Sequence, residues 1–322
     1  MKISIAMATY NGESFIGEQL QSFIDQSRQP DEVIITDDCS TDDTEAIVRE
    51  FENISPFEIK FYKNNMNLGY CGNFNNALMK STGDLVLLSD QDDVWFPEKI
   101  EHIMRLVECH PNALLIMNNA ELTDRELNTV GLTKIGQINS AGLPISSFVM
   151  GCCCAIKRDL LDICLPIVSG YKAHDNWLIH FAEGLDGKII DETVLQYYRR
   201  HDSNESKFIA NRTTRVTRRD MFFDRLNRIF FNKKNDIRVS LSQVKMFCEG
   251  VERSLQRAPH KYQSQLSEML EKELSQVRLM EERVEIYGKP FHKRLIAIFR
   301  LYWGGGYQGL DGCKSALRDL IG

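Results

Sequence analysis

Short apolar segments alternate with amphipathic helical patterns along residues 1 to 120 of this chain. The helical patterns begin near Glu13, Thr44 and Phe74 and again after Pro97, where apolar residues recur at the spacing of one helix face. Strands that are separated by helices run parallel in one sheet, which helices then cover on both faces. The chain is therefore predicted to be an α/β protein with a Rossmann-like, mostly parallel sheet. Its expected strands are residues 3–8, 33–35, 57–62, 85–88 and 113–117.

Polar residues follow each of these predicted strands. Parallel sheets bind their ligands at the carboxyl ends of the strands. A sheet needs no such bias for its own stability, so we expect a polar ligand at this edge. No G-x-G-x-x-G follows the first strand, which disfavours a dinucleotide. The polar strand ends are Thr9-Tyr10-Asn11, Asp37-Asp38, Asn64 to Asn67, Asp90-Gln91-Asp92 and Asn118-Asn119.

The most acidic strand end is the stretch from Asp90 to Asp93, in which three of four residues are aspartates. Crowded carboxylates repel one another unless a positive charge lies between them. Mg²⁺ and Mn²⁺ take oxygen ligands and often share them with substrate phosphates. The stretch therefore indicates a metal–diphosphate site. An acidic turn that caps the following helix is the alternative, and so short a motif does not decide between the two.

Composition limits the other possibilities. A length of 322 residues allows one large domain or two ordinary ones. The net charge of −6 and the pI of 5.7 argue against a dedicated nucleic-acid binder. No apolar run is long enough to cross a bilayer, and no signal peptide is evident, so a cytoplasmic protein is expected. None of the nine cysteines has zinc-knuckle spacing, and buried, reduced thiols are predicted.

The character of the sequence changes after Glu205. Apolar residues at helical spacing accompany the basic ones, so this segment could lie on an anionic membrane or pack on the preceding domain. A helical hairpin broken near Pro259 follows, and the basic, aromatic segment from Arg294 to Trp303 is a second candidate for membrane contact. We predict a domain of residues 1–205 and a helical, basic and amphipathic region of residues 206–322. The basic residues up to position 234 are Lys207, Arg212, Arg215, Arg218, Arg219, Arg225, Arg228, Lys233 and Lys234, and the apolar ones are Phe222, Leu226, Ile229 and Phe230.

Seven short motifs, in this order, resemble those of inverting family 2 glycosyltransferases with the GT-A fold, over roughly residues 1 to 205. The Ser-Asp-Gln-Asp-Asp, His-Asp-x-Trp and Tyr-Arg-x-His segments are together similar to a bacterial rhamnosyltransferase-like branch. The motifs are Ala8-Thr9-Tyr10-Asn11-Gly12, Asp37-Asp38-Cys39-Ser40-Thr41-Asp42, Asn67-Leu68-Gly69, Gly83-Asp84, Ser89-Asp90-Gln91-Asp92-Asp93-Val94-Trp95, His174-Asp175-Asn176-Trp177 and Tyr198-Arg199-Arg200-His201.

The resemblance implies a role for each matching residue. Asp38 would accept from the pyrimidine N–H, and Asp90 would lie near the ribose. Asp92 and His201 would bind Mn²⁺ or Mg²⁺, and Asp175 would be the general base. The full set of implied nucleotide contacts is Thr9, Tyr10, Asn11, Asp38, Asn67 and Asp90.

Several of these residues have a plainer interpretation that stays open. Asp175 could cap a helix, and His201 could be an ordinary surface histidine. Asp93 is expected only to hold the helix of Pro97, and Asp37 only to order its turn. His174 is expected to be a structural neighbour of the base. Trp95 and Trp177 could be packing residues or acceptor contacts.

The expected reaction is metal-dependent, inverting transfer of one sugar from dTDP-rhamnose or a UDP-hexose to a hydroxyl of a lipid-linked glycan such as O-antigen or capsule. A divalent ion neutralises the leaving diphosphate, and one carboxylate activates the acceptor hydroxyl. The Gln-x-x-Arg-Trp signature of processive synthases is absent, which favours single transfers. The enzyme is expected at the inner face of the cell membrane. The alternatives are a sugar-phosphate nucleotidyltransferase and a non-catalytic scaffold that uses the helical tail.

Overall fold

The computed structural model describes residues 1–202, 204, 208–231, 235–304, 306–307, 315–316 and 319–320, apart from the side chains of residues 225, 226, 228–231, 235, 236 and 287. The chain divides into two compact units, Met1–Arg218 and Arg219–Gly322. The predicted domain limit after residue 205 stays a prediction.

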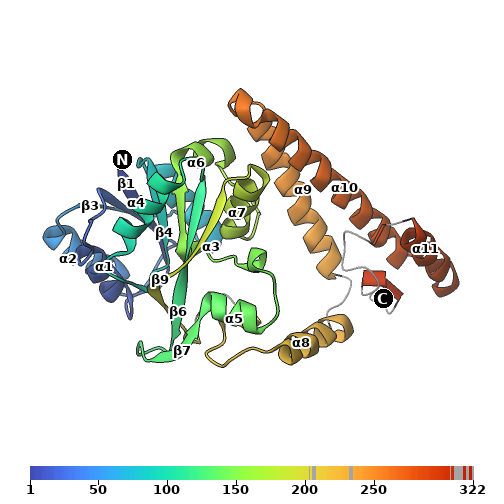
Figure 1. The fold of residues 1–322 in the computed structure, drawn as a ribbon, viewed down its shortest axis with the longest axis horizontal. Coiled ribbons are helices and arrows are strands. Elements are labelled where there is room, and N and C mark those ends of the chain that lie inside the picture. The colour runs from blue at the N-terminus through green and yellow to red at the C-terminus, as the bar shows by residue number, and fades with distance from the viewer. Residues whose placement is uncertain are drawn as a thin grey trace. The chain divides into compact units, whose positions relative to one another are not determined.

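One nine-stranded sheet organises the first unit (Figure 1). Its first four strands are parallel neighbours in the order β3-β2-β1-β4, and their alternation with helices along the chain confirms the predicted α/β pattern. β1, β2 and β4 are buried along nearly their whole length and are mostly apolar, as expected of strands that are covered on both faces, whereas β3 at the end of the strand order is partly exposed and alternates apolar with charged residues. Their bounds are β1 Ile3–Thr9, β2 Glu32–Asp37, β3 Glu58–Lys63 and β4 Leu85–Ser89.

The other half of the sheet is mixed. β8 pairs antiparallel with both β4 and β6, whereas β6 and β9 are parallel. These strands extend the order to β8-β6-β9-β5, and β7 pairs with β6 outside this path. Their bounds are β5 Val94–Trp95, β6 Leu115–Thr123, β7 Thr129–Thr133, β8 Cys154–Lys157 and β9 Lys188–Arg199.

One predicted strand end was wrong. Asn118 and Asn119 do not follow a strand but lie buried inside β6, which continues to Thr123. The register of β6 against β9 is irregular here, and the Asn119 side chain accepts from the backbone N–H groups of Ala120 and Ile135 at 2.9 and 3.0 Å. The Asn119 side chain therefore serves the strand itself, because an irregular ladder leaves backbone groups that need other partners, and the Asn118 amide donates to the Asn119 carbonyl oxygen at 2.7 Å.

Helices cover the sheet and build its core. In α1, the predicted apolar face is buried, since Ile16, Leu20 and Phe23 pack with the strand residues Ile5 and Met7. The helices of this unit are α1 Ile16–Ile24, α2 Thr44–Ile54, α3 Gly69–Lys80, α4 Lys99–Cys109, α5 Lys134–Ser140, α6 Arg158–Cys164 and α7 His174–Gly184, with 3-10 turns at Ile145–Ser147, Gly151–Cys153 and Ile209–Asn211.

Part of the basic segment belongs to the first unit and packs on α5. Gln137 of α5 donates to the carbonyl oxygens of Arg212 and Thr214 at 2.8 Å each, and Ser140 donates to that of Val216 at 2.6 Å. The Val216 side chain is buried. Of the two interpretations of this segment, packing therefore holds for residues 209–216. Lys207, Lys233 and Lys234 lie outside the described residues.

The second unit is helical. Its helices are α8 Arg218–Phe231, which begins at the division, α9 Asn235–Leu255, α10 Gln263–Tyr287 and α11 Phe291–Trp303, with a 3-10 turn at His260–Tyr262. α9 and α10 pack against each other as the predicted hairpin, whose turn contains Pro259. Within the described ranges, no helix combines the length and the apolar character that a bilayer crossing requires.

Candidate active site

Three neighbouring parallel strands end at one edge of the sheet. β2 ends at Asp37, β1 at Thr9 and β4 at Ser89, and in the ladder Thr9 lies beside Asp37 while Met7 lies beside Ser89. The polar residues that follow these strands are therefore neighbours in space, as the sequence predicted.

The segment after β1 is tied to the segment after β2. The buried hydroxyl of Thr9 donates to Asp37 at 3.1 Å, and Asp37 also accepts from the Ser40 backbone N–H at 2.9 Å. Asp37 thus orders its own turn, as interpreted from the sequence. Asn11 has a φ of 47°, which asparagine tolerates, and its side chain accepts from the Thr41 N–H at 3.0 Å. Tyr10 stays exposed.

Asp38 organises the loop that begins α3. Its carboxylate accepts from the backbone N–H groups of Leu68 and Gly69 at 2.8 Å each and from Asn64 at 3.0 Å. Asn67 donates to the Asp38 carbonyl oxygen at 3.3 Å. Three of the roughly four acceptor positions of a carboxylate are therefore filled, and one remains.

Gln91 fastens the acidic turn to the segment after β1. Its side-chain oxygen accepts from the Tyr10 N–H at 2.9 Å, and its side-chain nitrogen donates to the Tyr10 carbonyl at 3.0 Å. A Cβ at Gly12 would lie 2.7 Å from Gln91 Cδ, so a glycine is needed for this approach. The acidic turn and the segment after β1 are thus held side by side.

Asp92 contacts His201, which lies 109 positions later in the sequence. Asp92 Oδ2 lies 2.8 Å from His201 Nε2 and accepts from Asn204 at 3.0 Å. The His201 ring stacks on Phe15 with a centroid distance of 4.5 Å, and its side chain is almost fully buried. The alternative of an ordinary surface histidine is therefore wrong. Asn204 and Phe15 carried no signal in the sequence.

Arg199 fixes the backbone of the acidic turn. The buried guanidinium donates to the Asp92 carbonyl oxygen at 2.9 Å and to that of Arg125 at 2.7 Å, and it pairs with Glu18. It also lies over the Phe15 ring, 4.9 Å from the centroid. This arginine positions Asp92 through its main chain, a role that the Tyr-Arg-x-His motif did not reveal.

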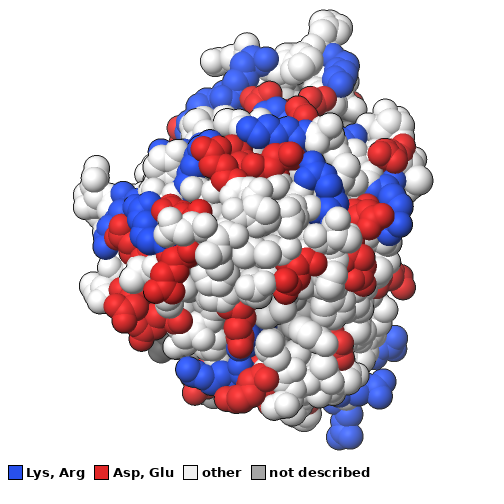
Figure 2. Space-filling view, turned by 90° about the vertical axis from the view of Figure 1, so that its left-hand side faces the viewer, with Lys and Arg blue, Asp and Glu red and all other residues white. Residues whose placement is uncertain are grey.

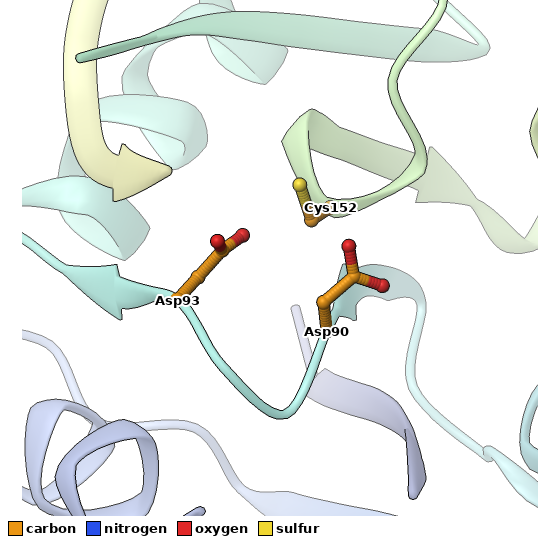
Figure 3. Close-up of side chains that lie close together, drawn as sticks. All are labelled: Asp90, Asp93 and Cys152. Atoms are coloured by element: carbon orange, nitrogen blue, oxygen red, sulfur yellow. The ribbon is translucent and has the colours of Figure 1, made fainter. Parts of the chain in front are cut away.

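Asp90 and Asp93 project from the two ends of the turn toward Cys152, as Figure 3 shows. One carboxylate oxygen of each and the Cys152 sulfur all lie within 4.8 Å of one another. The expectation that Asp93 only holds the following helix was wrong, because α4 has its N-cap at Glu98 and no side chain caps it. Asp93 is fully buried and instead accepts from Gln196 of β9 at 2.9 Å.

A buried lysine binds two residues that adjoin this cluster, Gln196 and Cys152. Lys99 of α4 donates to the Gln196 side-chain oxygen and, at 3.2 Å, to the Cys152 carbonyl oxygen. Its ammonium lies 3.8 Å from the centroid of the Trp95 ring. Burial lowers the pKa of Lys99 to about 8. Gln196 is thereby fixed with its amide N–H toward Asp93.

The cluster carries more negative charge than its surroundings balance. Burial, and then the charge of Asp92, raises the pKa of Asp90 to about 7. The same two causes raise the pKa of Asp93 well above its usual range. No lysine or arginine in the described part of the chain forms an ion pair with either carboxylate. A cation bound at this turn would relieve that repulsion.

Asp175 lies in the first turn of α7, whose N-cap is Ala173. Asp175 is therefore not the helix cap that was the alternative interpretation. It is partly exposed and accepts from the Asn176 N–H at 2.8 Å. A Cβ at Gly151 would lie 3.6 Å from Asp175 Cβ, so Asp175 is near the turn that carries Cys152. Its charge also contributes to the raised pKa of Asp90.

The aromatic neighbours of these residues are packing residues. The His174 ring stacks on Phe74 with centroids 4.0 Å apart and is buried, as expected of a structural neighbour. Trp177 is fully buried and donates to the Cys164 carbonyl oxygen at 2.9 Å. Trp95 is buried edge-to-face against Phe23. The open alternative of acceptor contacts for both tryptophans is therefore not realised.

The donor groups at the turn fit a hard divalent cation. Asp90 and Asp93 offer carboxylate oxygens close to one another, and Asp92, between them in the sequence, lies 2.8 Å from His201. Burial raises the pKa of the Cys152 thiol well above its usual value, so it stays protonated and is a poor ligand beside them. The structure thus offers a possible Asp–Asp–Cys cluster next to the Asp92–His201 pair that the sequence singled out.

The profile of the family described as "Glycosyl transferase family 2" matches residues 4–164, half of the chain. The chain belongs to glycosyl transferase family 2. It is 30% identical over 220 residues to a dTDP-rhamnosyl transferase, RfbG, of Shigella flexneri, which covers 62% of this chain and 73% of that protein. It is 26% identical over 215 residues to a putative glycosyltransferase, EpsE, of Bacillus subtilis, which covers 64% and 75%.

The glycosyltransferase is also similar to a solved structure. The crystal structure of residues 1–349 of TarS from S. aureus covers 88% of this chain and 90% of that one, at a TM-score of 0.55 and 20% identity. This confirms the expected GT-A fold. The protein is an enzyme of glycosyl transfer from nucleotide sugars, so the scaffold and the nucleotidyltransferase alternatives are set aside.

Proposed function

We propose that this glycosyltransferase uses Mn²⁺ or Mg²⁺ to move one sugar, with inversion, from dTDP-rhamnose or a UDP-hexose to a hydroxyl of a lipid-linked cell-surface glycan such as O-antigen or capsule. The observation that carries the proposal is the acidic turn: Asp92 lies 2.8 Å from His201, and beside it lie two carboxylates, Asp90 and Asp93, with which no Lys or Arg of the described residues forms an ion pair. A diphosphate bridged by a cation is the ligand that such an arrangement suits.

The nucleotide would bind along the ends of β1, β2 and β4. The remaining acceptor position of Asp38 suits an N–H of a pyrimidine base, and the exposed Tyr10 ring can contact that base or the ribose. Thr9, Asn11 and Asn67 would shape this binding surface through the loops they hold together. TarS structures with UDP and with UDP-GlcNAc support a nucleotide sugar as the donor for this fold.

Asp90 would lie beside the ribose, and Asp92 and His201 would hold the metal ion. The ion would neutralise the charge that develops on the leaving diphosphate. Arg199 and Asn204 keep Asp92 in place through its carbonyl and its carboxylate. His201 is in turn kept in orientation by stacking on Phe15.

Asp175 would be the general base. The residue is partly exposed and lies near the turn that holds Cys152, close enough to Asp90 for its charge to raise the pKa of that carboxyl. It would take the proton of the acceptor hydroxyl while that oxygen attacks the sugar from the side opposite the diphosphate. A single base in this position gives inversion, whereas a retaining glycosidase needs two carboxylates at the scissile bond.

Support for the donor and the acceptor comes from the relatives. The Shigella protein is named for dTDP-rhamnose, which suits the rhamnosyltransferase-like motifs of this chain. A lipid-linked acceptor agrees with the basic, aromatic second unit, which would bring the enzyme to an anionic membrane surface.

Titration calorimetry with UDP and dTDP, each with and without Mn²⁺, tests this function. We expect binding heat that depends on Mn²⁺ in the natural protein and is lost in Asp92→Ala. Asp162→Ala is the matched control, because this aspartate lies on the surface of α6, 68% exposed. Absence of heat with every nucleotide would refute the donor site, and equal heat in Asp92→Ala would refute the metal role. A panel of sugar nucleotides then identifies the donor by thermal stabilisation.

A further inference from the structure

α11 has two apolar faces, of which one is used inside the second unit. Ile298 is buried with Ile286 of α10 and with Tyr307, and Ala297 and Leu301 pack against the same small core. This inner face accounts for the attachment of α11 to the helical hairpin.

The outer face of α11 is apolar and exposed. Phe299 and Trp303 lie one helical turn apart with their ring centroids 5.8 Å from each other, so the two largest side chains form one surface. Large exposed apolar patches on a single helix face mark an interaction surface. The exposed fractions are 62% for Phe291, 43% for Leu295, 54% for Ile296, 64% for Phe299 and 74% for Trp303.

Charge identifies the partner of this outer face. α11 contains no acidic residue, whereas Lys293 and Arg300 are exposed on it and flank the apolar residues. The segregation extends to the whole chain: the second unit has 19 lysines and arginines against 13 aspartates and glutamates, and the first has 20 against 32. Figure 2 shows several acidic patches, with basic ones between them, on the side of the molecule turned to the viewer. An anionic surface would therefore attract the second unit and repel the first.

We propose that α11 docks on an anionic lipid bilayer, lying in the plane of the surface with Phe291, Phe299 and Trp303 among the headgroups. An interfacial helix combines a wide apolar face that contains Trp and Phe with flanking Lys and Arg, and α11 has both. Its inner face keeps it attached to the hairpin while the outer face enters the membrane. The interaction goes beyond the transfer reaction and does not depend on the donor or on the metal.

Co-sedimentation of the full chain with vesicles tests the proposal. We expect binding to vesicles of equal parts phosphatidylglycerol and phosphatidylcholine, weakening with salt, and little binding to phosphatidylcholine alone. Phe299→Ser with Trp303→Ser should weaken binding roughly tenfold or more. Lys293→Ala and Arg300→Ala should each weaken it about fivefold, which corresponds to about 1 kcal/mol per charge near the surface.

Matched controls come from the first unit. Ile54→Ser with Met79→Ser removes apolar side chains that are 65% and 54% exposed, and Arg105→Ala removes a cation whose side chain is 59% exposed. These variants should bind the anionic vesicles as the natural protein does. The same loss in the controls as in the α11 variants would overturn the proposal.

Two further results would overturn it. One is the absence of binding to phosphatidylglycerol vesicles at low salt. The other is a dimer in analytical ultracentrifugation that dissociates in the Phe299→Ser, Trp303→Ser variant, which would make the outer face a contact between two copies of the chain. Because no sugar nucleotide is present in these assays, either failure leaves the proposed donor, metal and base untouched and removes only the support that the second unit gives to a lipid-linked acceptor.

Discussion

Glu32 lies at the beginning of β2, whereas Asp90 and Asp93 follow the end of β4, at the opposite edge of the same parallel sheet. The Glu32 side chain is fully buried and accepts from the Ser4 hydroxyl at 2.6 Å and the Thr82 N–H at 2.7 Å. The Thr82 hydroxyl also donates to it at 2.8 Å, and Lys2 and Lys60 form ion pairs with it at 3.3 Å each. Burial by itself would raise the pKa of Glu32, but these hydrogen bonds outweigh it and lower the pKa to about 2.

Asp90 and Asp93 show the reverse. Burial and the charge of Asp92 raise their pKa values, and among the described residues no cation is paired with them. At the Glu32 edge the chain supplies every partner that a buried carboxylate needs. At the other edge it crowds carboxylates with which no Lys or Arg of the described residues forms an ion pair, a repulsion that the proposed cation would relieve. Such a difference is what we expect between a carboxylate that holds the fold together and carboxylates of the proposed ligand site.

The largest predicted effect is on catalysis at the edge that carries Asp90 and Asp93. Asp175→Asn should bind donor as the natural protein does but lower kcat by about 10²–10⁴-fold, because a general base contributes a factor of that size. The readout is sugar transfer under saturating donor, with donor affinity measured separately. Asp159→Asn is the matched control, since Asp159 lies in the first turn of α6 as Asp175 does in α7. Full transfer activity in Asp175→Asn would show that another group is the base.

The next effect is on stability at the Glu32 edge. Glu32→Gln should lower the free energy of unfolding by about 2 to 3 kcal/mol, because the buried hydrogen bonds to a charged acceptor are lost or weakened. Denaturant unfolding followed by the emission of the buried Trp95 and Trp177 reports on this unit. Glu58→Gln is the control: Glu58 lies beside Glu32 on β3, is 60% exposed and pairs with the same Lys60, so its loss should cost less than about 0.5 kcal/mol.

The pH dependence of that difference follows from the lowered pKa of Glu32. A carboxyl group with a folded-state pKa below its unfolded value stabilises the protein above the unfolded pKa, and the stabilisation is lost as the pH falls. The stability gap between the natural protein and Glu32→Gln should therefore narrow by about 1 kcal/mol on going from pH 7 to about pH 3.5. Unfolding curves of both proteins at the two pH values measure it. A gap that stays constant would mean that Glu32 is not ionised in the folded protein at neutral pH.

Sequence patterns predicted those features of the fold and of the site that depend on residues close together in the sequence. The alternation of apolar and amphipathic stretches located β1 to β4 and their helices, and the acidic turn, because each pattern is local. They could not show that Gln196 reaches Asp93 from 103 positions away, or that Arg199 fixes the Asp92 carbonyl from 107 positions away. Asp93 was misjudged for that reason: its nearest helix suggested a cap, but its partners come from β9. Asn118 and Asn119 were misplaced because an irregular register cannot be read from one strand.

The smallest predicted effect is on the free energy of unfolding, which should rise in Asp90→Asn and fall in Glu32→Gln. Asp90→Asn should raise the free energy of unfolding by about 1 kcal/mol without added metal, because it removes one of three crowded charges. The same variant should bind UDP or dTDP with Mn²⁺ more weakly than the natural protein. Asp162→Asn, on the surface of α6, should change stability by less than about 0.5 kcal/mol. Since Glu32→Gln and Asp90→Asn make the same chemical change at opposite edges, destabilisation by both would mean that Asp90 is a structural carboxylate, as Glu32 is.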